Sequence, residues 1–155
     1  MRENMGLYRG KRKDNGEWVE GAYYKQTLYY GDPCEKHYII TSTESLDYDQ
    51  ALEYYEVDPE TVGQYIGIPD KNGKKIFEDD IVRADDYIFV VRYGKCGGTP
   101  NADNYGYMGF YLEALSEGTK LCAKYGLRDD ICYFEDIEVI DNIHDNKKMI
   151  FDNKD

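Results

Sequence analysis

Short apolar runs alternate with turn-forming residues along most of the chain, which is the pattern of antiparallel β-strands. Residues 7–13 and 17–24 are strand-like and flank Asn15-Gly16, a dipeptide typical of tight hairpin turns. Residues 37–41 (HYIIT) predict another short strand. Strands followed by long helical patterns are absent, which argues against a parallel α/β fold. The sequence therefore predicts a mostly β protein, with short antiparallel strands forming a small barrel-like or two-sheet core and minor helix.

The middle of the chain has the most regular strand pattern. Residues 61–68 predict a strand in which Tyr65 faces away from the other apolar side chains. Residues 70–73 have the composition of a type I turn in which Gly73 is left-handed. Residues 87–93 (YIFVVRY) are the most apolar run, so we expect them to form a central strand.

Other segments are less regular. Residues 51–55 fit one helical turn, but residues 53–57 fit a strand equally well. The Gly- and Asn-rich residues 94–109 predict a surface excursion between strands. Residues 118–128 fit either a short helix or irregular structure, and residues 137–140 predict a last strand.

The length of 155 residues predicts one domain, or a division into an N-terminal β lobe (1–60) and a barrel-like C-terminal lobe (61–155). The chain contains 17 tyrosines among its 155 residues, which is an unusually high number. Tyrosine favours strands and also favours surfaces that bind proteins. Composition alone favours the first explanation.

Charge and cysteine content narrow the expected partners and compartment. The net charge of −12 repels phosphate backbones, so nonspecific nucleic-acid binding is not expected. The four cysteines form no CxxC pair or zinc motif. The N-terminal residues lack the apolar core of a signal peptide, and no apolar run is long enough to span a membrane. We expect a cytoplasmic protein without a cofactor and without a membrane partner.

Candidate catalytic groups are few. His37 and His144 are the two histidines. His37 lies in the predicted strand at residues 37–41, and His144, near Asp141 and Asp145, is expected to be a polar residue at an exposed strand end rather than a metal ligand. Glu78, Asp80 and Asp85 suggest a magnesium site, but neighbouring strand residues point to opposite faces, so Asp79 and Asp80 in the same acidic run would diverge. A metal-dependent enzyme is therefore the least favoured hypothesis, and no catalytic residue is assigned.

A nucleic-acid-binding module is the second hypothesis. It uses the basic hairpin of residues 9–13 (RGKRK), with Tyr8 and Trp18 close enough in sequence to stack on bases. A solvated hairpin tip explains the same residues, and the overall charge favours that explanation.

The sequence also resembles a known family. Residues 55–68 (YEVDPETVGQYIGI), followed by residues 70–73 (DKNG), 75–78 (KIFE) and 80–82 (DIV), are similar to the core motif of the YopX family. Residues 9–21 fit the opening hairpin of that family, and residues 138–146 fit its closing motif.

The family often has glycine where this chain has Asp79 and Asp141, which implies a left-handed backbone that aspartate tolerates. Lys147-Lys148 stand where the family's closing motif usually continues with proline. The residues that match are turn and apolar residues, typical of a fold signature: Trp18, Gly21, Val57, Thr61, Gly63, Gln64, Gly67, Asp70, Asn72, Gly73, Ile76, Phe77, Glu78, Asp80, Ile81, Val82 and Asn142.

The resemblance implies a protein encoded by a bacteriophage or prophage, mostly β, with a barrel-like part and a tendency to self-associate. It implies no activity. The leading hypothesis is therefore an accessory protein that acts by binding an unknown protein or further copies of itself. The candidate contact residues are Tyr105, Tyr107, Phe110 and Tyr111.

Overall fold

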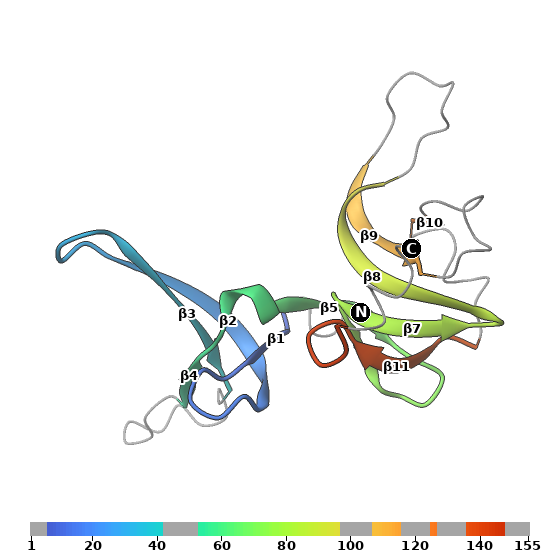
Figure 1. Cartoon of the computed structure of the whole chain (residues 1–155), viewed down its shortest axis with the longest axis horizontal. Helices are drawn as coiled ribbons and strands as arrows, with labels where there is room; N and C mark the ends of the chain where they lie inside the picture. Colours follow the sequence, from blue (N-terminus) through green and yellow to red (C-terminus); the bar gives the residue numbers. More distant parts are fainter. Residues whose placement is uncertain (1–5, 42–52, 97–106, 116–124, 127–135, 148–155) are drawn as a thin grey trace. The chain divides into compact units, whose positions relative to one another are not determined.

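The computed structural model describes residues 6–41, 53–96, 107–115, 125–126 and 136–147 (Figure 1). These residues form two antiparallel sheets, one with the order β4-β3-β2-β1-β5-β6 and one with the order β10-β9-β8-β7-β11. The two-sheet prediction is confirmed. The barrel form is not, because neither sheet closes on itself within the described residues. The chain divides into two compact units, Met1–Gly67 and Ile68–Asp155.

The first unit is built from five strands and one 3-10 turn, which are β1 (Tyr8–Lys11), β2 (Trp18–Leu28), β3 (Cys34–Ile40), β4 (Tyr54–Glu56), η1 (Pro59–Thr61) and the first part of β5 (Gly63–Pro69). The predicted β1–β2 hairpin is confirmed, with Gly16 in the left-handed region at φ 75°. The strand alternative for residues 53–57 is also confirmed, since β4 pairs with β3.

The start of β5 differs from the prediction. Residues 59–61 form the η1 turn, so the strand begins at Gly63 instead of Thr61. The Asp58 side chain accepts a hydrogen bond from the Glu60 amide and caps this turn. The Thr61 hydroxyl donates to the Asp58 carbonyl and accepts from the Lys11 amide, which ties the turn to β1. Tyr65 and Gly63 are the buried residues of the strand that follows.

The second unit contains the end of β5 and the strands β6 (Lys75–Phe77), β7 (Asp80–Ala84), β8 (Tyr87–Cys96), β9 (Tyr107–Ala114), β10 (Tyr125–Gly126) and β11 (Glu138–Asn142). The prediction that residues 87–93 form a central strand is confirmed, because β8 is the third of five strands. Val90 and Val91 point to opposite faces and are both fully buried. The middle of this sheet is therefore covered on both faces, which explains its continuous apolar run.

The turns of the second unit match the predicted backbone geometry at two positions and differ from it at a third. Residues 70–73 form the predicted turn, with Gly73 at φ 81° and its amide donating to the Asp70 carbonyl at 3.0 Å. Asp79 is left-handed at φ 69°, as the family resemblance implied. Asp141 is not left-handed; it lies at a register shift in the pairing of β11 with β7.

The predicted excursion at residues 94–109 is wrong at both of its ends. β8 and β9 continue into it, and Gly94, Lys95 and Cys96 pair with Gly109, Met108 and Tyr107. The composition suggested a loop, but the cross-strand hydrogen bonds of a long hairpin outweigh the weak strand preference of glycine. Residues 97–106 lie outside the described part of the chain. So do most of residues 118–128, for which the prediction was left open.

Candidate functional site

The β2–β3 hairpin of the first unit extends beyond its neighbouring strands (Figure 1). β1 pairs with β2 from Trp18 to Gly21, and β4 pairs with β3 from Tyr38 to Ile40. Beyond these points, residues 26–28 pair only with residues 34–36. Within the described part of the chain, both outer edges of this segment lack a partner strand. We call residues 22–40 the tyrosine ribbon.

The tyrosine ribbon exposes large aromatic side chains. Tyr24 is 51% exposed, Tyr29 78% and Tyr30 97%. Ile39, at the base of the ribbon, is buried, whereas every residue from Ala22 to Tyr38 is exposed or half-buried. Two-stranded hairpins without a covered face are marginally stable in water. The ribbon therefore exposes apolar surface and unpaired strand edges to solvent. A binding partner would cover both.

Cross-strand contacts hold the ribbon together. Lys25 Nζ lies 2.6 Å from Glu35 Oε1. The Tyr23 hydroxyl lies 2.6 Å from His37 Nδ1, and the two rings stack with centroids 6.0 Å apart. Burial raises the pKa of Tyr23, and the nearby Lys25 charge opposes that effect only in part. His37 is thus half-buried and hydrogen-bonded, and it lies in a strand as predicted.

The basic hairpin tip is occupied by its own acidic neighbours. Arg12 forms a bidentate pair with Asp14, and Lys13 Nζ lies 3.0 Å from Glu56 Oε1. The hydrogen bonds that Arg12 donates to Asp14 raise the pKa of Arg12 and lower the pKa of Asp14. The Trp18 ring faces the Arg9 guanidinium at 4.6 Å. A phosphate would have to compete with these carboxylates and this ring for the cations of the hairpin.

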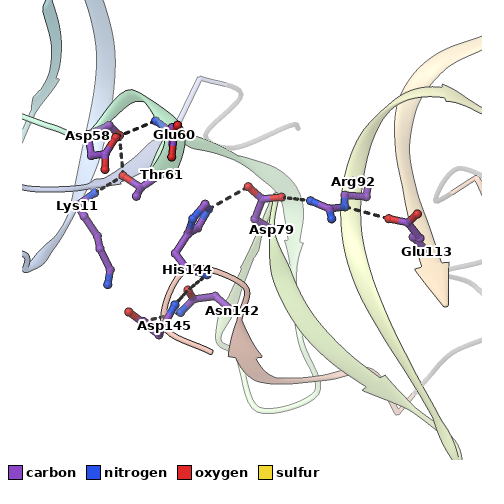
Figure 2. A network of polar contacts seen from close by, with 10 residues as sticks. All are labelled: Lys11, Asp58, Glu60, Thr61, Asp79, Arg92, Glu113, Asn142, His144 and Asp145. Atoms are coloured by element: carbon purple, nitrogen blue, oxygen red, sulfur yellow. Dashed lines mark hydrogen bonds and ion pairs between the residues drawn. The ribbon is translucent and has the colours of Figure 1, made fainter. Parts of the chain in front are cut away.

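In the second unit, a chain of polar contacts starts at Asp79, in the corner between β6 and β7 (Figure 2). Asp79 Oδ1 accepts from Arg92 Nη1 at 2.8 Å, and Asp79 Oδ2 lies 3.0 Å from His144 Nε2. Arg92 Nε also donates to Glu113 Oε2 at 3.0 Å. Burial alone would lower the pKa of Arg92, but its bonds and charges with Glu113 and Asp79 raise it. The guanidinium stays charged and joins β8, β9 and the corner.

A turn after β11 presents His144 to this corner (Figure 2). The Asn142 side-chain oxygen accepts the amides of His144 and Asp145 at 3.0 and 2.9 Å. The Ile143 amide donates to the Asp79 carbonyl at 3.0 Å. The His144 side chain is only 14% exposed, so the expectation of an exposed histidine near Asp141 and Asp145 is wrong. The sequence held no local signal for its contact with Asp79, which lies 65 residues earlier.

The side-chain contacts of Asp79 join strands and turns of the second unit to one another, rather than presenting a reactive group. A carboxylate beside an imidazole can orient a general base, but Asp79 shares its other oxygen with Arg92. Among the described residues, no group of three histidine, cysteine or acidic side chains is arranged to hold a metal. Asp80 is almost fully buried and accepts from the Phe77 amide, whereas Asp85 lies at φ 52° in the β7–β8 turn. The acidic residues of this region thus serve different local contacts.

The aromatic residues proposed from the sequence as contacts lie on and beyond β9. Tyr105 is outside the described residues, and Tyr107 pairs through its backbone with Cys96. Phe110 is half-buried against Tyr93, with ring centroids 5.1 Å apart, and Tyr111 is half-buried too. Among the tyrosines that the structure describes, the two most exposed are Tyr29 and Tyr30, in the ribbon. Two Tyr-Tyr pairs, at 23–24 and 29–30, were the sequence signal that could have located it.

The residues of the fold signature lie at positions where they pack, turn the chain or form hydrogen bonds within the fold. Some lie in the core or at close backbone approaches, some at left-handed turns, and some in hydrogen bonds that involve a side chain. The first group includes Val57, Ile76, Phe77, Ile81, Val82 and Gly21; the second Gly67 and Gly73; the third Thr61, Asp70, Asn72, Asp80 and Asn142. Gly63 and Gln64 pair with β1, Trp18 faces Arg9 and Lys11, and Glu78 precedes Asp79 in the corner.

The left-handed backbone at Asp79 gives a testable difference between two substitutions. Asp79→Ala and Asp79→Gly both remove the contacts to Arg92 and His144, but only alanine keeps a Cβ at φ 69°. We expect Asp79→Gly to be more stable than Asp79→Ala by about 1 kcal/mol. Urea unfolding followed by circular dichroism measures the difference. Equal stabilities would show that the positive φ carries no cost.

Together these features define an antiparallel β protein of two units. Buried polar groups join its strands and turns, and the tyrosine ribbon is exposed to solvent. Among its described residues, no helix is both long and apolar enough to cross a membrane. A family model described as YopX protein matches residues 7–150, so the chain belongs to the YopX family. A search of curated proteins found no match to this chain.

Proposed function

We propose that this YopX-family protein acts by binding another protein, with the tyrosine ribbon as its contact surface. The observation that carries the proposal is the combination of two open strand edges with Tyr24, Tyr29 and Tyr30 exposed beside them. Open edges supply backbone hydrogen bonds to an added strand. Exposed tyrosines supply contact area at low cost in side-chain entropy.

The setting that we propose follows from the family resemblance. It is the cytoplasm of a bacterial cell, with the gene carried by a phage or prophage. A second copy of the chain is one partner that the ribbon would accept. Tyr107, Phe110 and Tyr111 on β9 remain secondary candidates for such a contact, because Tyr93 and Met108 beside them are 51% and 64% exposed. Tyr105 is retained as a candidate from the sequence alone.

Nucleic-acid binding is less well supported than protein binding. The hypothesis depends on the cations of the β1–β2 hairpin, and Arg12 and Lys13 are both engaged by carboxylates. Binding to DNA would require these pairs to break in a protein with a net charge of −12.

The proposal is tested by comparing ribbon and control variants in a capture experiment. The tagged protein and its Tyr29→Ser/Tyr30→Ser variant are each incubated with a bacterial host lysate, and captured proteins are identified by mass spectrometry. We expect at least one specific partner to be lost by tenfold or more in the variant. Tyr87→Ser, at a residue 45% exposed on β8, is the matched control and should retain the partner.

Analytical ultracentrifugation of the same variants identifies a second copy as the partner, because the ribbon variant would then lose a concentration-dependent dimer. A strictly monomeric protein that captures the same set of proteins with and without the ribbon tyrosines would contradict the proposal.

A further inference from the structure

The tip of the tyrosine ribbon combines two aromatic rings with a carboxylate. Tyr29, Tyr30 and Asp32 are all exposed, and they surround Gly31, which turns the chain at φ 87°. The face of an aromatic ring attracts cations, and the attraction is strongest for arginine and lysine. A nearby carboxylate adds a full negative charge to the same surface. The tip therefore has the chemistry of a site for a cationic side chain.

The cations of the ribbon itself are already engaged. Lys25 pairs with Glu35 at 2.6 Å, and Lys36 lies 3.6 Å from Glu56 of β4. Neither lysine is therefore an unpaired charge that would repel a basic partner from the ribbon. Over residues 1–67 there are 13 acidic and 7 basic residues, so the first unit carries a net charge of −6. Such a field steers basic partners toward the surface and acidic partners away from it.

The open edges of the ribbon favour a partner that is extended. Backbone N–H and C=O groups along an open strand edge form hydrogen bonds with an added strand, whatever its sequence. Side chains of the added strand then supply the specificity. An edge of this kind beside an aromatic and acidic tip would select extended segments that carry arginine or lysine.

We infer that the tyrosine ribbon binds an extended, basic segment of a partner protein, with an arginine or lysine side chain held by Tyr29, Tyr30 and Asp32. The inference rests on the proposed function, because it names the chemistry of the partner at the same surface. The ribbon supplies the strand edge through its backbone, and the tip supplies the charge selectivity.

The test uses three fluorescent 12-residue peptides in which threonine alternates with arginine, glutamine or glutamate. Binding to the full-length protein is measured by fluorescence anisotropy. We expect the arginine peptide to bind at least tenfold more tightly than the glutamine peptide, and the glutamate peptide to bind more weakly than both. Tyr29→Ser/Tyr30→Ser and Asp32→Asn should each weaken arginine-peptide binding at least fivefold, whereas Tyr87→Ser should leave it unchanged.

The outcomes separate this inference from the proposed function. If the arginine peptide binds equally well to the tip variants, general attraction to an acidic protein explains the binding, and the inference is wrong. If all three peptides bind equally and lose binding in the tip variants, the ribbon binds strands without regard to charge. The inference then fails while the proposed function stands. Absence of binding by all three peptides also overturns the inference, and the capture experiment then decides the proposed function by itself.

Discussion

Replacing Gly21 by alanine is expected to destabilise the first unit by about 3 kcal/mol. An added Cβ would overlap the Ile40 carbonyl oxygen and lie 2.7 Å from the carbonyl carbon. These are backbone atoms of the neighbouring strand, so no side-chain rotation can relieve the overlap. The strands must separate where Ala22 pairs with Ile40, at the base of the tyrosine ribbon. The buried Ile39 would lose part of its packing at the same time.

Trp18 gives a direct measurement of this effect, because it is the single tryptophan of the chain and lies on β2. We expect its fluorescence transition in urea to shift to a lower midpoint in Gly21→Ala. Gly31→Ala is the matched control, since nothing lies within 4 Å of its added Cβ and only the positive φ is strained. That control should cost about 1 kcal/mol. A wild-type midpoint for Gly21→Ala would mean that the strands are further apart than described.

Replacing Asp70 by alanine is expected to destabilise the second unit by roughly 3 kcal/mol. The Asp70 carboxylate is 6% exposed and accepts three backbone N–H groups. Asn72 and Lys74 donate to Oδ1 at 2.8 and 2.9 Å, and Val139 donates to Oδ2 at 3.0 Å. Alanine leaves these buried and part-buried donors without that acceptor and removes one of the links between the 70–73 turn and β11. Faster hydrogen exchange at the Val139 amide is the specific measurement.

The same residue predicts a dependence of stability on pH. Burial acts to raise the pKa of Asp70, but the bonds from Val139, Lys74 and Asn72 outweigh it and lower the pKa below the ordinary 3.8. Because the folded pKa lies below the unfolded one, the carboxylate stabilises the fold fully above pH 3.8. The contribution is lost as the pH falls through the folded pKa. The stability difference between wild type and Asp70→Asn should therefore be constant near neutral pH and shrink in acid. A difference that grows in acid would contradict this assignment.

The sequence predicted those elements whose cause is local. The turn at 70–73 and the hairpin at Asn15-Gly16 follow from residues that tolerate their backbone angles, and the central strand follows from a run of apolar residues. The left-handed Asp79 came from the family resemblance, which the full-length match supports.

Features that depend on distant residues were missed. The contact of His144 with Asp79 joins positions 65 residues apart, and neither position signals the other. The exposure of the tyrosine ribbon depends on where β1 stops, and the pattern of β2 itself does not change there. For the same reason the aromatic residues on and beside β9, and not those of the ribbon, were predicted as the contact surface. Which strand lies beside another is a tertiary property, and it decides which aromatic residues reach solvent.

The two long-range contacts of the second unit also have a consequence for the order of events during synthesis. The Asp70 carboxylate can bind the Val139 amide only after 69 further residues have been synthesised. The Asp79 carboxylate can bind His144 only after 65 further residues have been synthesised. The strand pairs of the first unit are complete once residue 67 has left the ribosome. The first unit can therefore assemble while the second is still being translated. A ribosome stalled before residue 139 would hold a chain in which Asp70 lacks its contact with Val139 and Asp79 lacks its contact with His144.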